Sequence, residues 1–284
     1  MSNITPQMVK DLRERTGVGM SKCKEALDEA KGDMEKAIEI LRKSGMASAV
    51  KKEGRETKEG LISYYETKEA IALVEVNCET DFVAQNEKFK SFIDSLAKQV
   101  AEQKISNLES LMNKPSISDK TLSVEQYRNL VVQALGENIQ VKRILLIEKG
   151  KDTSYGIYVH MKGKILSVVE VKGALGEEAL AKEVAMHSVA SSPDYLNPQM
   201  VPQDVIEKEK EIARSQIKNK PENVIEKIVV GKIQSFFDEV CLICQKYVKD
   251  PNVSIQQFID NRGKAVAKNL QVSNFWRWKV GNER

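Results

Sequence analysis

The heptapeptide from Cys78 to Ala84 has the most distinctive spacing of reactive and apolar side chains in this chain. In it an acid and an aromatic residue, Asp81 and Phe82, follow an apolar run at 71–76 that predicts a buried strand. We expect Asp81 to be the N-cap of the next helix, with Phe82 on its first turn. Such a pair is either a helix cap with a buried phenyl ring or a wedge aimed at another protein. Because most phenylalanines lie in cores, the residues alone favour the buried ring.

The remaining reactive side chains are too isolated to predict catalysis. Cys241 and Cys244 form one C-x-x-C pair with no second pair, which is a weak signal for zinc or redox chemistry. His160 falls in a predicted strand and His187 on a helix face, and single histidines of this kind are usually structural. No phosphate-binding glycine loop and no nucleophile motif occurs. We therefore expect no catalytic residue, no metal site and no cofactor, and a binding protein rather than an enzyme.

Composition excludes several classes of protein. The 284 residues carry a formal net charge of +3 from 44 basic and 41 acidic side chains that are mixed along the chain, so no broad basic face for nucleic acid is expected. Aromatic residues make up only 6%, which argues against a base-stacking surface. No apolar stretch approaches the ~18 residues of a membrane-spanning helix, and the N-terminus lacks a signal-peptide pattern. We expect a soluble, cytoplasmic protein without a disulfide framework.

The N-terminal part predicts a small bundle of three helices at 4–44. Its first helix starts at Thr5–Pro6 and ends at the glycine-containing stretch 16–19, which terminates a helix rather than binding phosphate. Asp33 is expected to cap the third helix. The charged segment 51–58 that follows is predicted to be a linker.

An internal repeat follows the helical part. Residues 60–76 parallel 156–171, each as two strands joined by a tight turn and ending in Val-Glu-Val. Helices are predicted after each copy, at about 87–103 and about 176–190. Two such halves pair pseudo-symmetrically in an α+β fold with antiparallel sheets.

Further elements complete the predicted organisation. A helix is expected at 123–135 and a strand at 140–147. An antiparallel helical hairpin is predicted at about 202–240, long enough to project from the core. The chain is expected to end with a helix at 254–269 and a strand at 274–280.

Taken together, these pieces resemble the bacterial elongation factor Ts family. The similarity rests on an ordered set of motifs that covers about residues 5–280, at 12–20, 23–24, 26–27, 77–84, 136–139, 160–164, 185–187, 227–231 and 248–251. Each motif is weak alone, and the segment 77–84 is the most specific.

The resemblance implies an exchange factor for elongation factor Tu that promotes release of GDP and allows GTP to bind. It implies a partner-docking, UBA-like helical domain at 1–54, core subdomains at 55–140 and 141–284, and an antiparallel coiled coil at about 202–240. It is compatible with a dimer or a 2:2 complex with the partner. It implies no cofactor, no direct nucleic acid contact and no membrane contact.

The resemblance also implies which residues meet the partner. Asp81 and Phe82 would intrude near the magnesium and phosphate site of the GTPase, and Asp81 would either cap its loop or touch the partner. The full set of implied contact residues is Thr80, Asp81, Phe82, Val83, His160, Arg13, Gly17, Gly19 and Met20.

The chain departs from the family pattern at three places. Gln85 stands where a basic residue is common, and Trp276 and Trp278 stand where Phe is more usual. The sequence also stops soon after Val280, where some members continue into an extra helical module, and we expect that contact to be missing.

Two alternatives come from other classes of protein. A UBA-like adaptor would use residues 4–44 alone and leave the core dispensable, which the ordered core motifs disfavour. An RNA-binding accessory protein of the ribosome would need clustered basic residues, which the charge balance disfavours.

Overall fold

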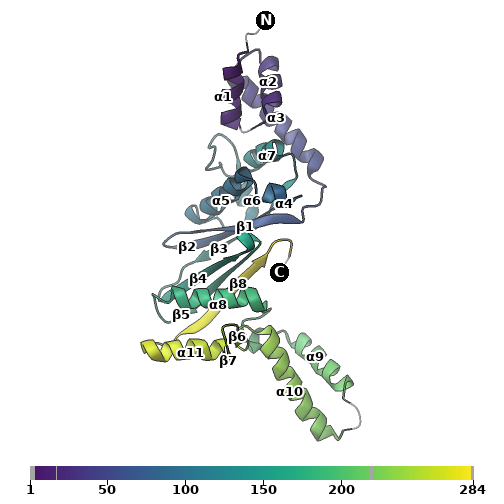
Figure 1. Cartoon of the computed structure of the whole chain (residues 1–284), viewed down its shortest axis with the longest axis vertical. Coiled ribbons are helices and arrows are strands. Elements are labelled where there is room, and N and C mark those ends of the chain that lie inside the picture. The colour runs from purple at the N-terminus through teal and green to yellow at the C-terminus, as the bar shows by residue number, and fades with distance from the viewer. Residues whose placement is uncertain (1–3, 17, 218–219, 283–284) are drawn as a thin grey trace. The chain divides into compact units, whose positions relative to one another are not determined.

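The computed structural model describes residues 4–16, 18–217 and 220–282 (Figure 1). Contacts divide the chain into two compact units. The first unit comprises the residues up to Lys149, the short stretch Lys162–Lys164 and the residues from Lys279 onward, and the second comprises Gly150–Met161 and Ile165–Trp278. Helices and small antiparallel sheets both contribute, which confirms the predicted α+β class.

Three helices open the first unit: α1 (Pro6–Thr16), α2 (Met20–Glu29) and α3 (Met34–Lys52). Asp33 caps α3 as predicted, because its carboxylate accepts a hydrogen bond from the Lys36 amide at 3.1 Å. The helices enclose a small apolar core that includes Leu12 and Leu27, both fully buried.

The prediction of a linker at 51–58 is wrong for its first two residues, which are helical. The segment that follows them is hydrogen-bonded to the core. Lys51 and Lys52 form the last turn of α3. Beyond the helix, the Asn138 side-chain amide donates to the carbonyls of Glu53 and Arg55, at 3.1 and 2.8 Å. Charge composition indicated a solvated tether, but these backbone groups are satisfied by a buried side chain that is distant in the sequence.

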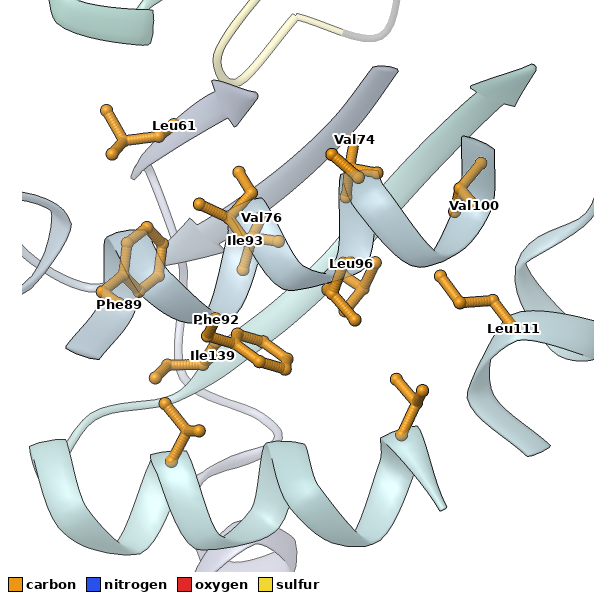
Figure 2. Packing of buried hydrophobic residues seen from close by; sticks show 14 of the residues in the cluster. Leu61, Val74, Val76, Phe89, Phe92, Ile93, Leu96, Val100, Leu111 and Ile139 are labelled. Carbon is orange, nitrogen blue, oxygen red and sulfur yellow. The ribbon is translucent and has the colours of Figure 1, made fainter. Parts of the chain in front are cut away.

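The sheet of the first unit has the order β1-β2-β3, with β1 (Glu59–Glu66), β2 (Ala70–Cys78) and β3 (Ile139–Glu148) all antiparallel to their neighbours. Every residue of β2 is buried. Helices α5 (Glu87–Glu102), α6 (Leu108–Asn113) and α7 (Val124–Leu135) complete this part. Figure 2 shows the side chains of α5 that fill the core, namely Phe89, Phe92, Ile93, Leu96 and Val100.

Helix α3 is packed on α7, which joins the helical part to this core. Gln133 of α7 donates to the Ser44 hydroxyl at 3.1 Å, and Arg42 donates to Thr121 at 2.7 Å. At Gly45 an added Cβ would meet the Asn129 carbonyl at 3.4 Å, so the two helices approach closely there.

The second unit holds the second copy of the repeat. Its sheet has the order β4-β5-β8, with β4 (Thr153–His160), β5 (Ile165–Lys172) and β8 (Gln271–Lys279). Helix α8 (Glu178–Ser191) packs on β4 and β5, as α5 packs on β1 and β2. Strand β8 begins three residues before the predicted strand at 274–280.

The remaining elements of the second unit include one small sheet that the sequence did not predict. They are the short helix η2 (Pro198–Met200), the strand pair β6 (Lys246–Tyr247) and β7 (Asp250–Ser254), and helix α11 (Ile255–Val266). The short helix η1 (Met161–Gly163) lies at the boundary of the two units in the sequence.

Helices α9 (Gln203–Ser215) and α10 (Glu222–Val240) occupy the segment of the predicted hairpin. Ala213 of α9 packs with Val229 and Ile233 of α10 in a small cluster of buried side chains. Within the described ranges, no helix is long and apolar enough to cross a membrane.

Candidate protein-binding site

The candidate site is a single helical turn, α4 (Asp81–Ala84), that directly follows β2. Thr80, not the predicted Asp81, is its N-cap: the Thr80 hydroxyl accepts a hydrogen bond from the Val83 amide at 3.3 Å. Asp81 is instead the first residue inside the turn and is exposed. Thr80 has the N-cap position because its backbone is extended and its carbonyl already accepts the first helical hydrogen bond, from the Ala84 amide at 3.2 Å.

Phe82 is 84% exposed, so the prediction of a buried ring is wrong. The turn directs its other apolar side chains inward: Ala84 is fully buried and Val83 packs against the core cluster. Leaving a phenyl ring in water forgoes about 2 kcal/mol of burial free energy. Phe82 is the most exposed large apolar side chain among the described residues, which makes it a candidate contact residue.

A carboxylate from another segment holds the loop before this turn. Glu137 accepts from the Glu79 and Thr80 amides, each at 3.0 Å, and its second oxygen accepts from the Thr80 hydroxyl at 2.6 Å. Glu137 is partly buried and follows Gly136, the left-handed residue (φ 82°) that ends α7. Three hydrogen bonds to one charged group fix the backbone in front of Phe82.

A reciprocal set of bonds runs from this loop back to the same segment. The Glu79 carboxylate accepts from the Asn138 amide at 2.6 Å and lies 3.5 Å from the Arg55 guanidinium. We call the bonds of Glu137 to residues 79–80, and of Glu79 to Asn138, the carboxylate clasp. Glu137 and Asn138 were not among the predicted contact residues. The motif at 136–139 could have indicated these two residues, because they are polar and directly follow a glycine that ends a helix.

Cys78 supplies no nucleophile to the site. Burial, assisted by the charge of Glu137, raises the pKa of the Cys78 thiol to about 12. The protonated thiol donates to the Thr80 carbonyl at 3.1 Å. Its function here is to support the turn that carries Phe82, since only a thiolate is a good nucleophile.

Three of the predicted contact residues lie in the helical part of the same unit. Arg13, Gly19 and Met20 are exposed, and Met20 is a large apolar side chain with 51% of its surface accessible. Gly17 lies outside the described residues. The predicted end of the first helix in the stretch 16–19 is confirmed, because α1 ends at Thr16, and Gly19 itself is the N-cap of α2 with an extended backbone.

Cys23 of α2 is fully buried, and burial raises the pKa of its thiol. The thiol donates to the Val18 carbonyl at 3.4 Å, which ties the start of α2 to the residue before its N-cap.

His160 belongs to the second unit. It is the exposed last residue of β4, and its Nδ1 lies 3.3 Å from the Tyr158 hydroxyl, with the two rings stacked. The turn that follows has positive φ at Met161 and Lys162, and Met161 is 65% exposed. An imidazole and a thioether are thus presented together at this turn.

The reactive side chains of His187 and Cys241 are buried inside the second unit. His187 is fully buried: its Nδ1 accepts from the Val248 amide at 3.3 Å and its Nε2 faces the Gln245 side-chain oxygen at 3.0 Å. Burial raises the pKa of the Cys241 thiol to about 12. In the part of the chain that the structure describes, no cluster of three His, Cys, Asp or Glu side chains is arranged to hold a metal ion.

Comparison with known proteins assigns this arrangement to a family. The family model described as elongation factor TS matches residues 79–282, a span that starts at the carboxylate clasp. The chain belongs to the elongation factor Ts family. It is 54% identical to elongation factor Ts of Protochlamydia amoebophila (strain UWE25), over 99% of this chain and 100% of that protein. It is 46% identical to elongation factor Ts of Chlamydia muridarum and 44% identical to that of Chlamydia caviae, with the same coverage.

Membership of the elongation factor Ts family makes the chain a nucleotide exchange factor of translation elongation. The motifs of the sequence predicted this family, and the comparisons confirm it.

Proposed function

We propose that this chain binds elongation factor Tu in its GDP form and accelerates GDP release, so that GTP can bind. The observation that carries this proposal is Phe82, which is 84% exposed on a turn whose start is fixed by the carboxylate clasp. Immobilising the backbone before binding lowers the entropic cost of inserting the ring into a partner. A buried aromatic in a preformed slot is a typical hot spot, whose truncation costs about 2 kcal/mol or more.

The proposed mechanism is displacement rather than covalent chemistry. GTPases hold their nucleotide mainly through Mg²⁺ and backbone groups around the phosphates. Asp81 and Phe82 enter beside that site and shift those groups, which weakens nucleotide binding. By linkage, bound nucleotide weakens the binding of the factor by the same amount, so GTP releases it again.

The other proposed contacts surround this wedge. Thr80 and Val83 form the base of the turn, and Asp81, which does not cap it, is available to touch the partner. Arg13, Gly19 and Met20 are exposed on the helical part, and His160 is exposed at the end of β4. Gly17 stays in the proposed set although it lies outside the described residues.

Larger parts of the chain receive roles on the same basis. We propose that residues 1–54 form a UBA-like domain that docks on the partner, and that 55–140 and 141–284 form the core. The segment at 202–240, with α9 and α10, is proposed to be an antiparallel coiled coil that serves either as a second contact arm or in a dimer or 2:2 complex. Because the partner works in translation, we place the chain in the cytoplasm.

The test is release of fluorescent GDP from elongation factor Tu by the wild type and by Phe82→Ala. The wild type is expected to accelerate GDP release, and the variant is expected to accelerate it at least about tenfold less. Leu175→Ala is the matched control, because Leu175 is also a large exposed apolar residue (69%) but lies outside the proposed contacts. It should release GDP at the wild-type rate.

Other outcomes separate the alternatives. Equal acceleration by the wild type and Phe82→Ala would retain exchange but assign the mechanism to other contacts. No acceleration by folded wild type would contradict the proposal and favour a UBA-like adaptor, or a ribosome-associated RNA-binding protein if binding to RNA were found.

A further inference from the structure

We propose that Glu137 is the positioning residue of the exchange reaction: it holds the Phe82 turn in the orientation that enters the partner. This inference rests on the proposed function and extends it to a residue that does not itself touch the GTPase. Its basis is the carboxylate clasp, in which one carboxylate satisfies three donors on the two residues before the turn.

The geometry explains why a carboxylate is required. The Glu79 and Thr80 amides point at the same Glu137 oxygen, and the Thr80 hydroxyl points at the other. The same hydroxyl also accepts from the Val83 amide, so Glu137 fixes the cap that begins α4. A chain of bonds thus runs from Glu137 through Thr80 into the turn on which Phe82 stands. Charge-assisted bonds of this kind are short and directional, which suits a positioning role.

Position of the ring matters because the turn itself has little intrinsic stability. Helix α4 has only four residues, too few to form without tertiary contacts. Inside the protein, Val83 and Ala84 pack on the core, but Phe82 makes no contribution to that packing because it is exposed. The direction of the ring is therefore set by the backbone, and the backbone is set by Glu137.

The clasp also reaches the chain that leaves α3. Asn138, next to Glu137, donates to the Glu53 and Arg55 carbonyls, and Glu79 lies beside the Arg55 guanidinium. One polar cluster thus holds both the Phe82 turn and the segment that connects it to the helical part of the unit.

The first test uses Glu137→Ala and Glu137→Gln in the full-length chain, with Glu66→Gln as the control. Glu66 pairs with Lys149 at the far end of β1, away from the turn. Glu137→Ala is expected to lower the maximal rate of GDP release about tenfold, because a small misplacement of a working group is costly. Glu137→Gln keeps one acceptor oxygen and should fall between Ala and the wild type, and Glu66→Gln should match the wild type.

A double-mutant comparison separates positioning from a merely structural effect. If Glu137 acts through Phe82, then Glu137→Ala combined with Phe82→Ala releases GDP no more slowly than Phe82→Ala alone. Multiplied losses in the double variant would overturn the inference, as would a wild-type rate for Glu137→Ala.

Hydrogen exchange at the Glu79, Thr80 and Val83 amides provides a readout that is independent of the partner. These amides are expected to lose protection in Glu137→Ala, while the amides of β2 keep theirs. Unchanged protection would overturn the positioning role even if the wild type failed to release GDP. If the wild type failed to release GDP but the amides of Glu137→Ala lost their protection, only the proposed function would be contradicted.

Discussion

At the residue scale, Phe82 and Glu137 differ in their environment. Phe82 is outside the core and is proposed to contribute recognition and little stability, whereas Glu137 is partly buried and is proposed to set the geometry of the turn. The two residues are 55 positions apart, and they are linked through the hydroxyl and amide of Thr80. A substitution at either residue should therefore act on exchange through the same turn.

His187 is a fully buried side chain outside the proposed contact set, and its protonation links stability to pH. Burial lowers its pKa below the ordinary value of 6.5, although the bond to Gln245 acts in the opposite direction. Protonation therefore favours the unfolded chain, so the contribution of neutral His187 is present above about pH 6.5 and is lost as the pH falls toward the folded pKa.

We expect His187→Gln to flatten this dependence. Urea unfolding at about pH 7.5 and about pH 5.5 should show a smaller decrease in unfolding free energy for the variant than for the wild type. Equal decreases in the two proteins would show that other groups account for the acid sensitivity.

At the element scale, the repeated strand–turn–strand–helix unit depends on close approach of helix and sheet. At Gly156 in β4, an added Cβ would lie 2.0 Å from the Lys182 amide nitrogen of α8. No side-chain movement relieves an overlap with backbone, so β4 and α8 can only pack at this distance with glycine.

Gly156→Ala is expected to destabilise the protein by about 3 kcal/mol, because α8 must move off the sheet. Gly231→Ala is the matched control: Gly231 lies in α10 with no atom within 4 Å of the new Cβ. That variant should gain up to about 1 kcal/mol from helix propensity. Chemical denaturation of both variants gives the comparison, and a similar unfolding free energy for the two would contradict it.

At the scale of the whole molecule, the C-terminal residues return to the sheet of the first unit. Glu75 lies in β2, and its acidic side chain is only 1% exposed. Its carboxylate accepts from the Arg143 guanidinium at 2.8 Å and from the Gly281 amide at 3.1 Å. One buried carboxylate thus joins the centre of the sheet to a residue 206 positions later.

Glu75→Gln should therefore be costly, because it removes the ion pair between the buried Glu75 carboxylate and the Arg143 guanidinium. We expect a loss of about 2 kcal/mol, below the usual cost of breaking a buried pair because Arg143 is partly exposed. Glu66→Gln, which removes a more exposed partner of Lys149, should cost less than about 1 kcal/mol. Urea denaturation followed by circular dichroism measures both, and a Glu75 effect no larger than that of Glu66 would refute this assignment.

Sequence patterns predicted the local elements well where periodicity is strong. The apolar spacing of Phe89, Phe92, Ile93, Leu96 and Val100 predicted a helix with one buried face, and α5 has that face. The repeat and its helices were predicted for the same reason, and the ordered motifs were enough to identify the family. The unpredicted β6–β7 pair is short and carries charged and turn-forming residues, so it leaves little periodic signal.

By itself, then, the sequence determined the fold class, most elements and the family of this protein. Hydrophobic spacing depends only on residues that are near one another in the sequence, and the motifs are identified by their order along it. Only the tertiary structure decided that Phe82 is exposed, that Thr80 rather than Asp81 caps its turn, and that the Glu53 and Arg55 carbonyls are anchored. Glu137 and Asn138 bond to the loop before the turn and to this anchored segment, although they lie more than 50 residues away from the turn and farther still from Glu53 and Arg55. Contacts at such separation leave no periodic trace in the sequence, since they arise only when the end of α7 is brought against the end of β2.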